Sequence, residues 1–259
     1  MEIEIKQEVN FNELCSRLRN VSLRGFPNVK IYGNALIDIR PLSPLQVKSE
    51  LFTPQPSVYT DFLDKISRLA ELFSQRGVDI FNLNGGVDYT STDEKGEVTD
   101  WTMVPPVVEV FPVFFKWVKG LNYSLDYSSS ISPEVISLMK KNGFELNPEL
   151  QDLDYPEYQK FKGKTQKVSE ICDGSHRVEA GVRRGLEQNI LFIDSPVWGY
   201  PYYAAPKPYS TVHEESDRDK SDKTHVLTSP GHKLLYRLFP SGGILSGTVR
   251  PPTSKEKFI

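Results

Sequence analysis

Three features of this 259-residue sequence predict a mixed α/β (α+β) fold, in which helices pack on a small mixed sheet. Residues 57–76 place apolar side chains on one helical stripe and end at Gly77, a common helix stop. Residues 107–111 are mostly β-branched or aromatic, and this composition is typical of a buried strand. Residues 168–194 read in order as a strand, a tight turn, a helix and a second strand.

Local signals predict further strands in the first half of the chain. Residues 28–40 alternate in short apolar pairs, which predicts one or two strands. Pro41 and Pro44 are expected to end regular structure after them. Turn residues at 84–86 and 93–96 predict a short hairpin between the long helix and the buried strand.

Helix caps and polar stretches complete the expected element order. Ser57 or Thr60 can cap the long helix, and residues 132–142 have the serine cap, early proline and following glycine of a short helix. Residues 144–164 are polar and rich in tyrosine and proline, so we expect irregular structure there. The charged run 213–223 has no apolar period and is expected to be a mobile surface loop.

Composition limits the class of protein. The net charge of −3 gives no broad electrostatic grip on nucleic acid. Cys15 and Cys172 are far apart, and we expect two reduced thiols. Residues 1–11 lack the basic and apolar regions of a signal peptide, and residues 103–118 are too short and interrupted to cross a bilayer. We therefore expect a cytoplasmic protein with no membrane partner.

The turn Asp173-Gly174-Ser175-His176-Arg177, between a predicted strand and helix, has the chemistry of an anion site. A helix start leaves backbone N–H groups unpaired and carries the positive end of the helix dipole. Gly174 permits close approach of a ligand, Ser175 adds a hydroxyl, and His176 and Arg177 add phosphate donors. Asp173 and Ser175 are also ordinary helix caps, so a plain turn is the competing interpretation.

The run ICDGSHRVEAGVRRGLEQNILFID, residues 171–194, resembles the ParB/sulfiredoxin-like superfamily. It is most similar to the Asp-Gly-x-His-Arg box of the ParB-related free serine kinases. Ser175 stands where sulfiredoxins carry their reactive cysteine, so the resemblance does not imply sulfiredoxin chemistry. The matching positions are Asp173, Gly174, His176, Arg177, Ala180 and Gly185.

The resemblance also implies a division of the chain. The segment IDIRPLSPLQVKSE, residues 37–50, looks like the first box of the superfamily. The implied core is residues 28–195, with an insertion at 113–165 that includes a helix. Residues 1–27 and 196–259 would then be N-terminal and C-terminal extensions.

The function implied by the resemblance is a Mg²⁺-dependent, nucleotide-binding enzyme that transfers or hydrolyses phosphate. The nucleotide would be ATP, ADP or CTP, and the partner a small-molecule substrate. Gly174, Ser175, His176 and Arg177 would hold the phosphates, and His176 would also donate a proton or hydrogen bond. Asp173 would orient His176 or hold Mg²⁺.

One departure from the family concerns the catalytic base. In the serine kinases a glutamate follows the proline of the first box, and Gln46 stands at the matching position. Glutamine has no titratable carboxylate and cannot take a proton. Glu50, one helical turn later, is the nearest replacement, and Gln46 could still position a water or hydroxyl.

Two other functions remain open at this point, a ParB-like DNA nuclease and a nucleotide-gated clamp without catalysis.

Weaker candidates for site residues lie nearer the C-terminus. The aromatic run 198–209 can stack a nucleobase or pack on the core. Residues 229–240 are faintly similar to a serine-kinase segment, which would bring His232 and Arg237 to the phosphate site. The oligomeric state is not indicated.

Overall fold

The computed structural model describes residues 2–54, 57–118, 121–126, 131–143, 165–199, 206–215, 234–239, 244–246 and 248–250. Its described helices are α1 (Phe11–Arg19), α2 (Pro44–Glu50), α3 (Thr60–Ser74), α4 (Pro133–Lys141), α5 (Ser175–Arg183) and the 3-10 helix η3 (Tyr209–Thr211). Its described strands are β1 (Glu2–Val9), β2 (Ser22–Leu23), β3 (Phe26–Lys30), β4 (Leu36–Leu42), β5 (Leu51–Thr53), β6 (Ser57–Tyr59), β7 (Gly86–Thr92), β8 (Val98–Met103), β9 (Val107–Val118), β10 (Leu121–Asp126), β11 (Thr165–Asp173), β12 (Gln188–Asp194), β13 (Lys207–Pro208), β14 (His213–Glu215), β15 (Arg237–Leu238), β16 (Ile244–Ser246) and β17 (Thr248–Arg250). The predicted mixed α/β class is confirmed.

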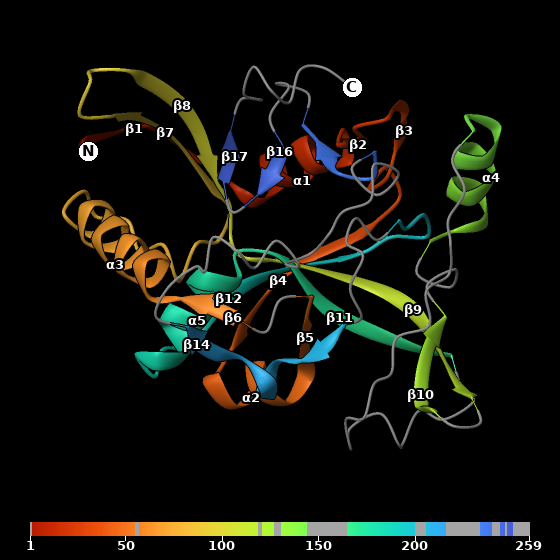
Figure 1. The fold of residues 1–259 in the computed structure, drawn as a ribbon. Coiled ribbons are helices and arrows are strands. Elements are labelled where there is room, and N and C mark those ends of the chain that lie inside the picture. The colour runs from red at the N-terminus through yellow and green to blue at the C-terminus, as the bar shows by residue number, and fades with distance from the viewer. Residues whose placement is uncertain are drawn as a thin grey trace.

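A mixed sheet forms the centre of the molecule, with strand order β13-β5-β11-β9-β12-β4 and β10 added beside β9 (Figure 1). Strand β12 runs parallel to β9 and antiparallel to β4. Strand β11 runs antiparallel to β9 and parallel to β5. Helix α5, which connects β11 to β12, packs on one face of this sheet through Val178 and Val182.

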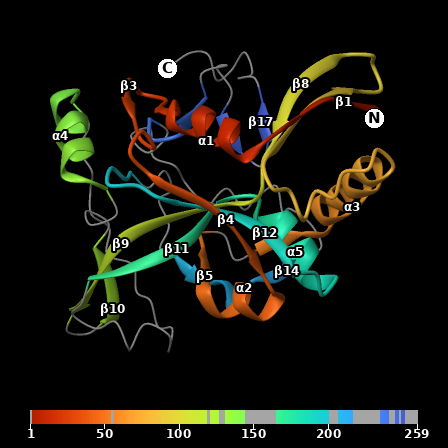
Figure 2. The same ribbon diagram turned by 180° about the vertical axis from the view of Figure 1, so that it is seen from behind.

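The two faces of the central sheet bury different residues of the same strand. Leu191 and Ile193 of β12 pack with α1, while Ile190 and Phe192 pack with α2 and α5. This is the alternation expected of a strand covered on both faces. Figures 1 and 2 agree that α1 lies on one side of the sheet and that α2 and α5 lie on the other.

A second sheet lies on the α1 side, with strand order β1-β7-β8-β17-β16-β15-β2-β3 (Figure 2). The sequence patterns predict one small sheet, and they do not predict this second sheet. The pairing of the N-terminal β1 with β7 joins segments about eighty positions apart, and a local pattern cannot show such pairing. The predicted hairpin is confirmed as β7 and β8, joined by a turn at residues 93–97.

The long helix begins three residues later than expected. Ser57, Val58 and Tyr59 form β6, which pairs in parallel with β14, so part of the predicted mobile loop is a strand. The hydroxyls expected to cap the helix bind β14 carboxylates instead. Ser57 donates to Glu215 at 2.6 Å and Thr60 donates to Glu214 at 2.7 Å.

The prolines at 41 and 44 do not end regular structure, which corrects the prediction. Pro41 lies within β4, opposite Asn189, where β4 is the last strand of the sheet order. An edge strand tolerates proline because one side needs no ladder hydrogen bond. Pro44 occupies the first turn of α2, where its missing N–H costs nothing.

The remaining element predictions are largely confirmed. Helix α4 follows Ser132 and is followed by Gly143 in the left-handed conformation, although Ser132 makes no side-chain cap. The strand–turn–helix–strand unit is β11, α5 and β12. Residues 144–164 lie outside the described part of the chain. Neither Cys15 nor Cys172 forms a disulfide, and no helix among the described residues is long and apolar enough to cross a membrane.

A buried ion pair joins the C-terminal part of the chain to the central strand. Arg237 of β15 and Glu109 of β9 are 3% and 5% exposed. The guanidinium donates to both carboxylate oxygens, to the hydroxyl of Tyr32 and to the carbonyls of Gly199 and Leu235. Arg237 therefore belongs to the core and not to a phosphate site, which corrects the expectation from residues 229–240. His232 lies outside the described residues.

Breaking this ion pair on one side is expected to destabilise the fold strongly. Arg237→Met leaves Glu109 buried without its cation, at a cost of about 3–5 kcal/mol of unfolding free energy. The double variant Glu109→Gln/Arg237→Met recovers part of that loss because neither charge remains. Urea unfolding measures both. Lys6→Met, which breaks the exposed pair with Glu4, is the control and should cost at most about 1 kcal/mol. An Arg237→Met loss no larger than the control would contradict the assignment.

Candidate functional site

The turn between β11 and α5 has a backbone that only glycine fits well. Gly174 has φ of 83° and stands at the N-cap of α5 in the left-handed conformation. A β-carbon at this position would lie 3.1 Å from Pro106, which immediately precedes β9. The turn therefore presses against the start of the central strand, and the first residues of α5 follow at once.

Arg177, in the first turn of α5, is buried without a hydrogen-bonding acceptor. Its side chain lines a cavity, yet the residue is only 3% exposed. Within the described part of the chain, Nε and both terminal guanidinium nitrogens have no hydrogen-bond partner. Burial lowers the pKa of Arg177 to about 10, although Asp173 and Tyr89 oppose the shift. A buried guanidinium without hydrogen-bond partners lowers the stability of the fold unless an acceptor from outside the protein binds it.

Asp173 is the buried carboxylate beside this cation. Burial raises its pKa to about 7, against the opposing effects of Arg177 and of a hydrogen bond with the Gly174 backbone. No hydrogen-bond partner of its Oδ2 lies among the described residues. The charges of Asp173 and Arg177 interact without a direct hydrogen bond. The guanidinium can therefore still bind an anion, and the carboxylate can still bind a metal ion or a hydrogen-bond donor.

His176 is held by aromatic side chains from β6 and the start of α3. Its ring stacks on Tyr59 with a centroid distance of 6.1 Å, and the ring of Phe62 is 4.9 Å away. His176 also lines the cavity next to Arg177. Ser175 occupies the first helical position of α5 and is half-buried.

The cavity has a volume of about 510 Å³, within the usual range for small-molecule sites. Its lining residues come from three parts of the fold, namely α3, the β7–β8 hairpin and the N-terminal end of α5. The lining residues are Lys65, Ile66, Arg68, Leu69, Tyr89, Ser91, Glu94, Trp101, Met103, Gly174, His176 and Arg177. The sequence-predicted turn therefore opens into a ligand-sized space.

Sequence reasoning missed the walls contributed by α3 and the hairpin. Lys65 and Arg68 are exposed residues three positions apart on α3, so they share a face of the helix. Tyr89 and Trp101 are directly opposite each other in the hairpin and point to the same side of its two strands. The alternation of large side chains, such as Tyr89 and Trp101, is a signal that the sequence does contain. This alternation does not show that the hairpin lines the same cavity as the turn at Gly174.

Glu50, the candidate catalytic base, and Gln46, the candidate positioning group, lie on α2, outside the described lining of this cavity. The side chain of Gln46 completes a capping box with Ser43, accepting from its backbone N–H at 3.1 Å and its hydroxyl at 2.9 Å. Glu50 is exposed at the last position of α2. Asp173, His176 and Arg177 lie within five residues of the chain, and His176 and Arg177 line the cavity, whereas Gln46 and Glu50 do not.

The described residues form no metal cage, so a magnesium ion at this turn would need further oxygen ligands from a bound molecule. No group of three or more histidine, cysteine, aspartate or glutamate side chains that could hold a metal occurs among the described residues. Mg²⁺ usually takes one or two carboxylates and completes its shell with phosphate and water. The unpaired Oδ2 of Asp173 suits that role.

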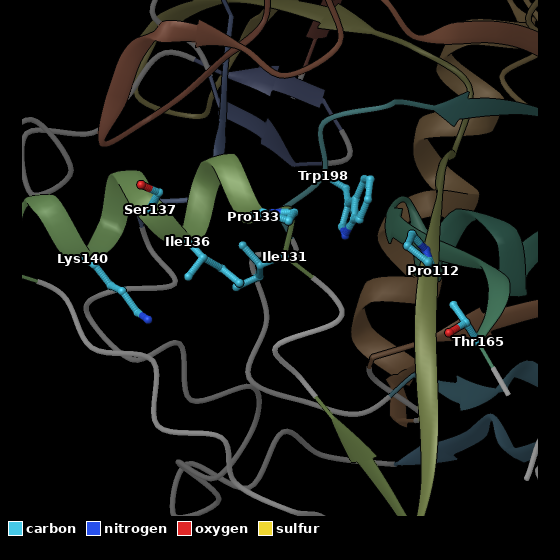
Figure 3. Close-up of a pocket in the computed structure, with 8 residues that line it drawn as sticks. All are labelled: Pro112, Ile131, Pro133, Ile136, Ser137, Lys140, Thr165 and Trp198. Carbon is cyan, nitrogen blue, oxygen red and sulfur yellow. The ribbon is translucent and has the colours of Figure 1, made fainter. Parts of the chain in front are cut away.

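Other sequence candidates lie elsewhere. Trp198 lines a different cavity of about 550 Å³ beside α4 (Figure 3). Tyr209 is buried and donates its hydroxyl to Glu179 at 2.9 Å, so this member of the aromatic run packs in the core. Tyr200, Tyr202 and Tyr203 lie outside the described residues. Arg183 binds Glu179 and Glu214, and it does not line the cavity at the turn.

Comparison with known proteins gives one relationship. A family model described as the ParB CE domain matches residues 13–111. Comparisons with curated proteins and with solved structures found no match. The matched region runs from α1 into β9 and includes α3 and the hairpin, but it ends before the turn at Gly174. Residues 13–111 are therefore similar to a ParB-related family, and this similarity covers less than half of the chain.

Proposed function

We propose that this chain binds a nucleotide by its phosphates at the start of α5 and, with Mg²⁺, transfers or hydrolyses phosphate. The observation that carries the proposal is the buried guanidinium of Arg177, which has no acceptor among the described residues and lines a ligand-sized cavity. A phosphate offers planar pairs of oxygens that match the donors of arginine. ATP, ADP and CTP are the nucleotides to test.

Several positive groups converge on the same space. The backbone N–H groups and dipole of α5 favour an anion at its first turn. Lys65 and Arg68 line the cavity from α3, where they can contact the outer phosphates. Because the cavity also contains the buried Arg177, a polyphosphate is a better match than a single anion.

The residues of the turn supply the groups that phosphoryl transfer needs. Arg177 binds the transferring group, and His176 donates to a phosphate oxygen or to the leaving group. Asp173 would hold the magnesium ion, which neutralises charge developing on the phosphates when bound. A small-molecule hydroxyl or a water would be the acceptor. Glu50 and Gln46 remain the proposed groups for positioning it.

A DNA nuclease is the less favoured alternative. The net charge of −3 lacks the basic character expected of a nucleic-acid-binding protein. If the protein bound a DNA duplex with an affinity that falls steeply as salt is added, and bound no free nucleotide, the nuclease would become the favoured function.

Arg177→Met is expected to abolish nucleotide binding without destabilising the ligand-free protein. The substitution removes a buried cation that makes no hydrogen bond within the described structure, and the neighbouring Asp173 can bind a proton once that cation is gone, so the unfolding free energy should stay equal or rise. Calorimetric titration of ATP and CTP with Mg²⁺ measures the affinity, and urea unfolding measures the stability.

Arg184→Met is the matched control. Arg184 follows α5 and lies over the ring of Phe81, outside the lining of the cavity. It should leave nucleotide affinity unchanged. If folded Arg177→Met bound nucleotide as tightly as the native protein, the proposed function would be refuted.

The raised pKa of Asp173 predicts a pH-dependent effect on stability. The ordinary aspartate pKa is about 3.9. In the folded state the pKa is about 7, so ionisation opposes folding. The stabilising contribution of the protonated form is complete below about pH 4 and is lost as pH rises to about 7. Asp173→Asn should therefore match the native protein at pH 4 and exceed its unfolding free energy by up to a few kcal/mol at pH 8.

Urea unfolding of both proteins from pH 4 to pH 8 tests this prediction. Groups that titrate in both proteins cancel in the difference between them. A difference that does not change with pH would show that Asp173 is not held in a desolvated environment.

Substitutions on α2 separate a catalytic role from a structural one. Gln46→Ala removes the capping box and should cost about 1 kcal/mol of stability. Glu50→Ala removes an exposed carboxylate and should leave stability within about 0.5 kcal/mol. If Glu50 is the base, its substitution lowers turnover at saturating nucleotide more than Gln46→Ala does. The reverse order would exclude Glu50.

A further inference from the structure

We propose that the β7–β8 hairpin forms the nucleobase subsite of this cavity, with the indole of Trp101 as the stacking surface. This inference rests on the proposed function, because it assigns the far end of a ligand whose phosphates bind Arg177. The chemical class is a flat aromatic ring joined to a polyphosphate. The argument rests on how Trp101 is fixed, on what connects it to Arg177 and on what faces it.

Trp101 is fixed in orientation by its own hairpin. Its indole N–H donates to the Ser91 hydroxyl at 2.7 Å. Its ring lies nearly parallel to that of Tyr89, at 17° and a centroid distance of 6.4 Å. Because the indole N–H is already satisfied, the ring can offer its face to a ligand without an unmet polar group.

Tyr89 connects this aromatic surface to the phosphate end. Its ring packs edge-on against Phe73 with a centroid distance of 4.9 Å, and the residue is 4% exposed. Burial raises the pKa of the phenol, while the positive charge of Arg177 opposes that rise. Tyr89 therefore lies near enough to the guanidinium to be influenced by its charge. Trp101, Tyr89 and Arg177 all line a single cavity, in which the rings of Trp101 and Tyr89 are neighbours.

The wall contributed by α3 is apolar where the base would lie. Ile66 and Leu69 line the cavity from α3, and Met103 lines it from the end of β8. All three also pack with the hydrophobic cluster that contains Phe73 and Tyr89. Trp101 itself is only half-buried, whereas Phe73 and Tyr89 are buried. A flat ring inserted beside Trp101 would bury the exposed remainder of the indole.

The aromatic run at 198–209 is the competing location for a base. Trp198 lies instead in the cavity beside α4, among Pro112, Ile131 and Thr165 (Figure 3). None of the residues 198–209 that the structure describes lines the cavity at the turn. Trp198 thus provides a matched control, because the same substitution can be made at a tryptophan in a different cavity.

The test is calorimetric titration of ATP, CTP and inorganic tripolyphosphate, each with Mg²⁺, into the native protein, Trp101→Leu, Trp101→Phe, Trp198→Leu and Arg177→Met. Stacking of a base on an aromatic side chain corresponds to an affinity gain of about tenfold or more. At least one nucleotide should therefore bind the native protein about tenfold tighter than tripolyphosphate. In Trp101→Leu, the affinity for that nucleotide should fall to the affinity for tripolyphosphate. Trp101→Phe and Trp198→Leu should keep most of the difference in affinity between the nucleotide and tripolyphosphate.

The outcomes separate this inference from the proposed function. Equal affinity of nucleotides and tripolyphosphate for the native protein, or unchanged nucleotide affinity in folded Trp101→Leu, overturns the base subsite but leaves the phosphate site standing. A loss in Trp198→Leu in place of Trp101→Leu moves the base to the other cavity and also overturns it. Failure of the native protein to bind any of the three ligands overturns the proposed function itself. Circular dichroism confirms the fold of each variant.

Discussion

The burial of Arg177 without an acceptor is the constraint on which the site depends. A guanidinium removed from water costs free energy unless its donors are satisfied. The fold tolerates it because Asp173 supplies a nearby opposite charge and because α5 is anchored by apolar residues on the opposite face, including Val178 and Val182. The close contact of Gly174 with Pro106 holds the first turn of α5 in place. A group that is rigidly held and unsatisfied is prepared for an anion, since little reorganisation is needed when the anion arrives.

The other buried arginine shows the contrasting case. Arg237 binds a carboxylate, a phenol and two backbone carbonyls. Burial acts to lower the pKa of Arg237, but the charge of Glu109 outweighs it and raises this pKa. Its donors are occupied inside the protein, so it has no capacity for a ligand. The two residues are equally buried, at 3% exposure each, and differ only in their partners. Burial alone is therefore a poor guide to function, whereas burial without an acceptor is an informative one.

The turn at residues 173–177 could be predicted from the sequence because its signals are local. The strand, the glycine and the helix start follow one another within a few residues, and α5 begins where they predict. The prolines at 41 and 44 were misjudged because their effect depends on the sheet edge and the helix turn that they occupy. The hairpin was predicted, but its position over α3 was not, because pairing of β1 with β7 and packing against Phe73 are long-range. The sequence drew attention to Trp198, which lies in an aromatic run, and not to Trp101, and only the tertiary fold places the two residues in different cavities.

The division of the cavity between two regions of the chain bears on how a ligand affects the protein. The ParB CE match covers α3 and the hairpin, whereas the turn that presents Arg177 comes from residues beyond the matched segment. A ligand held by Trp101 at one end and Arg177 at the other would bridge these two regions. Any change in how α3, the hairpin and α5 approach one another would then change the affinity for the ligand. By linkage, the bound ligand would favour the arrangement in which both of its ends are held. The base and the phosphates would thus contribute to one binding event through elements that meet only in the folded chain.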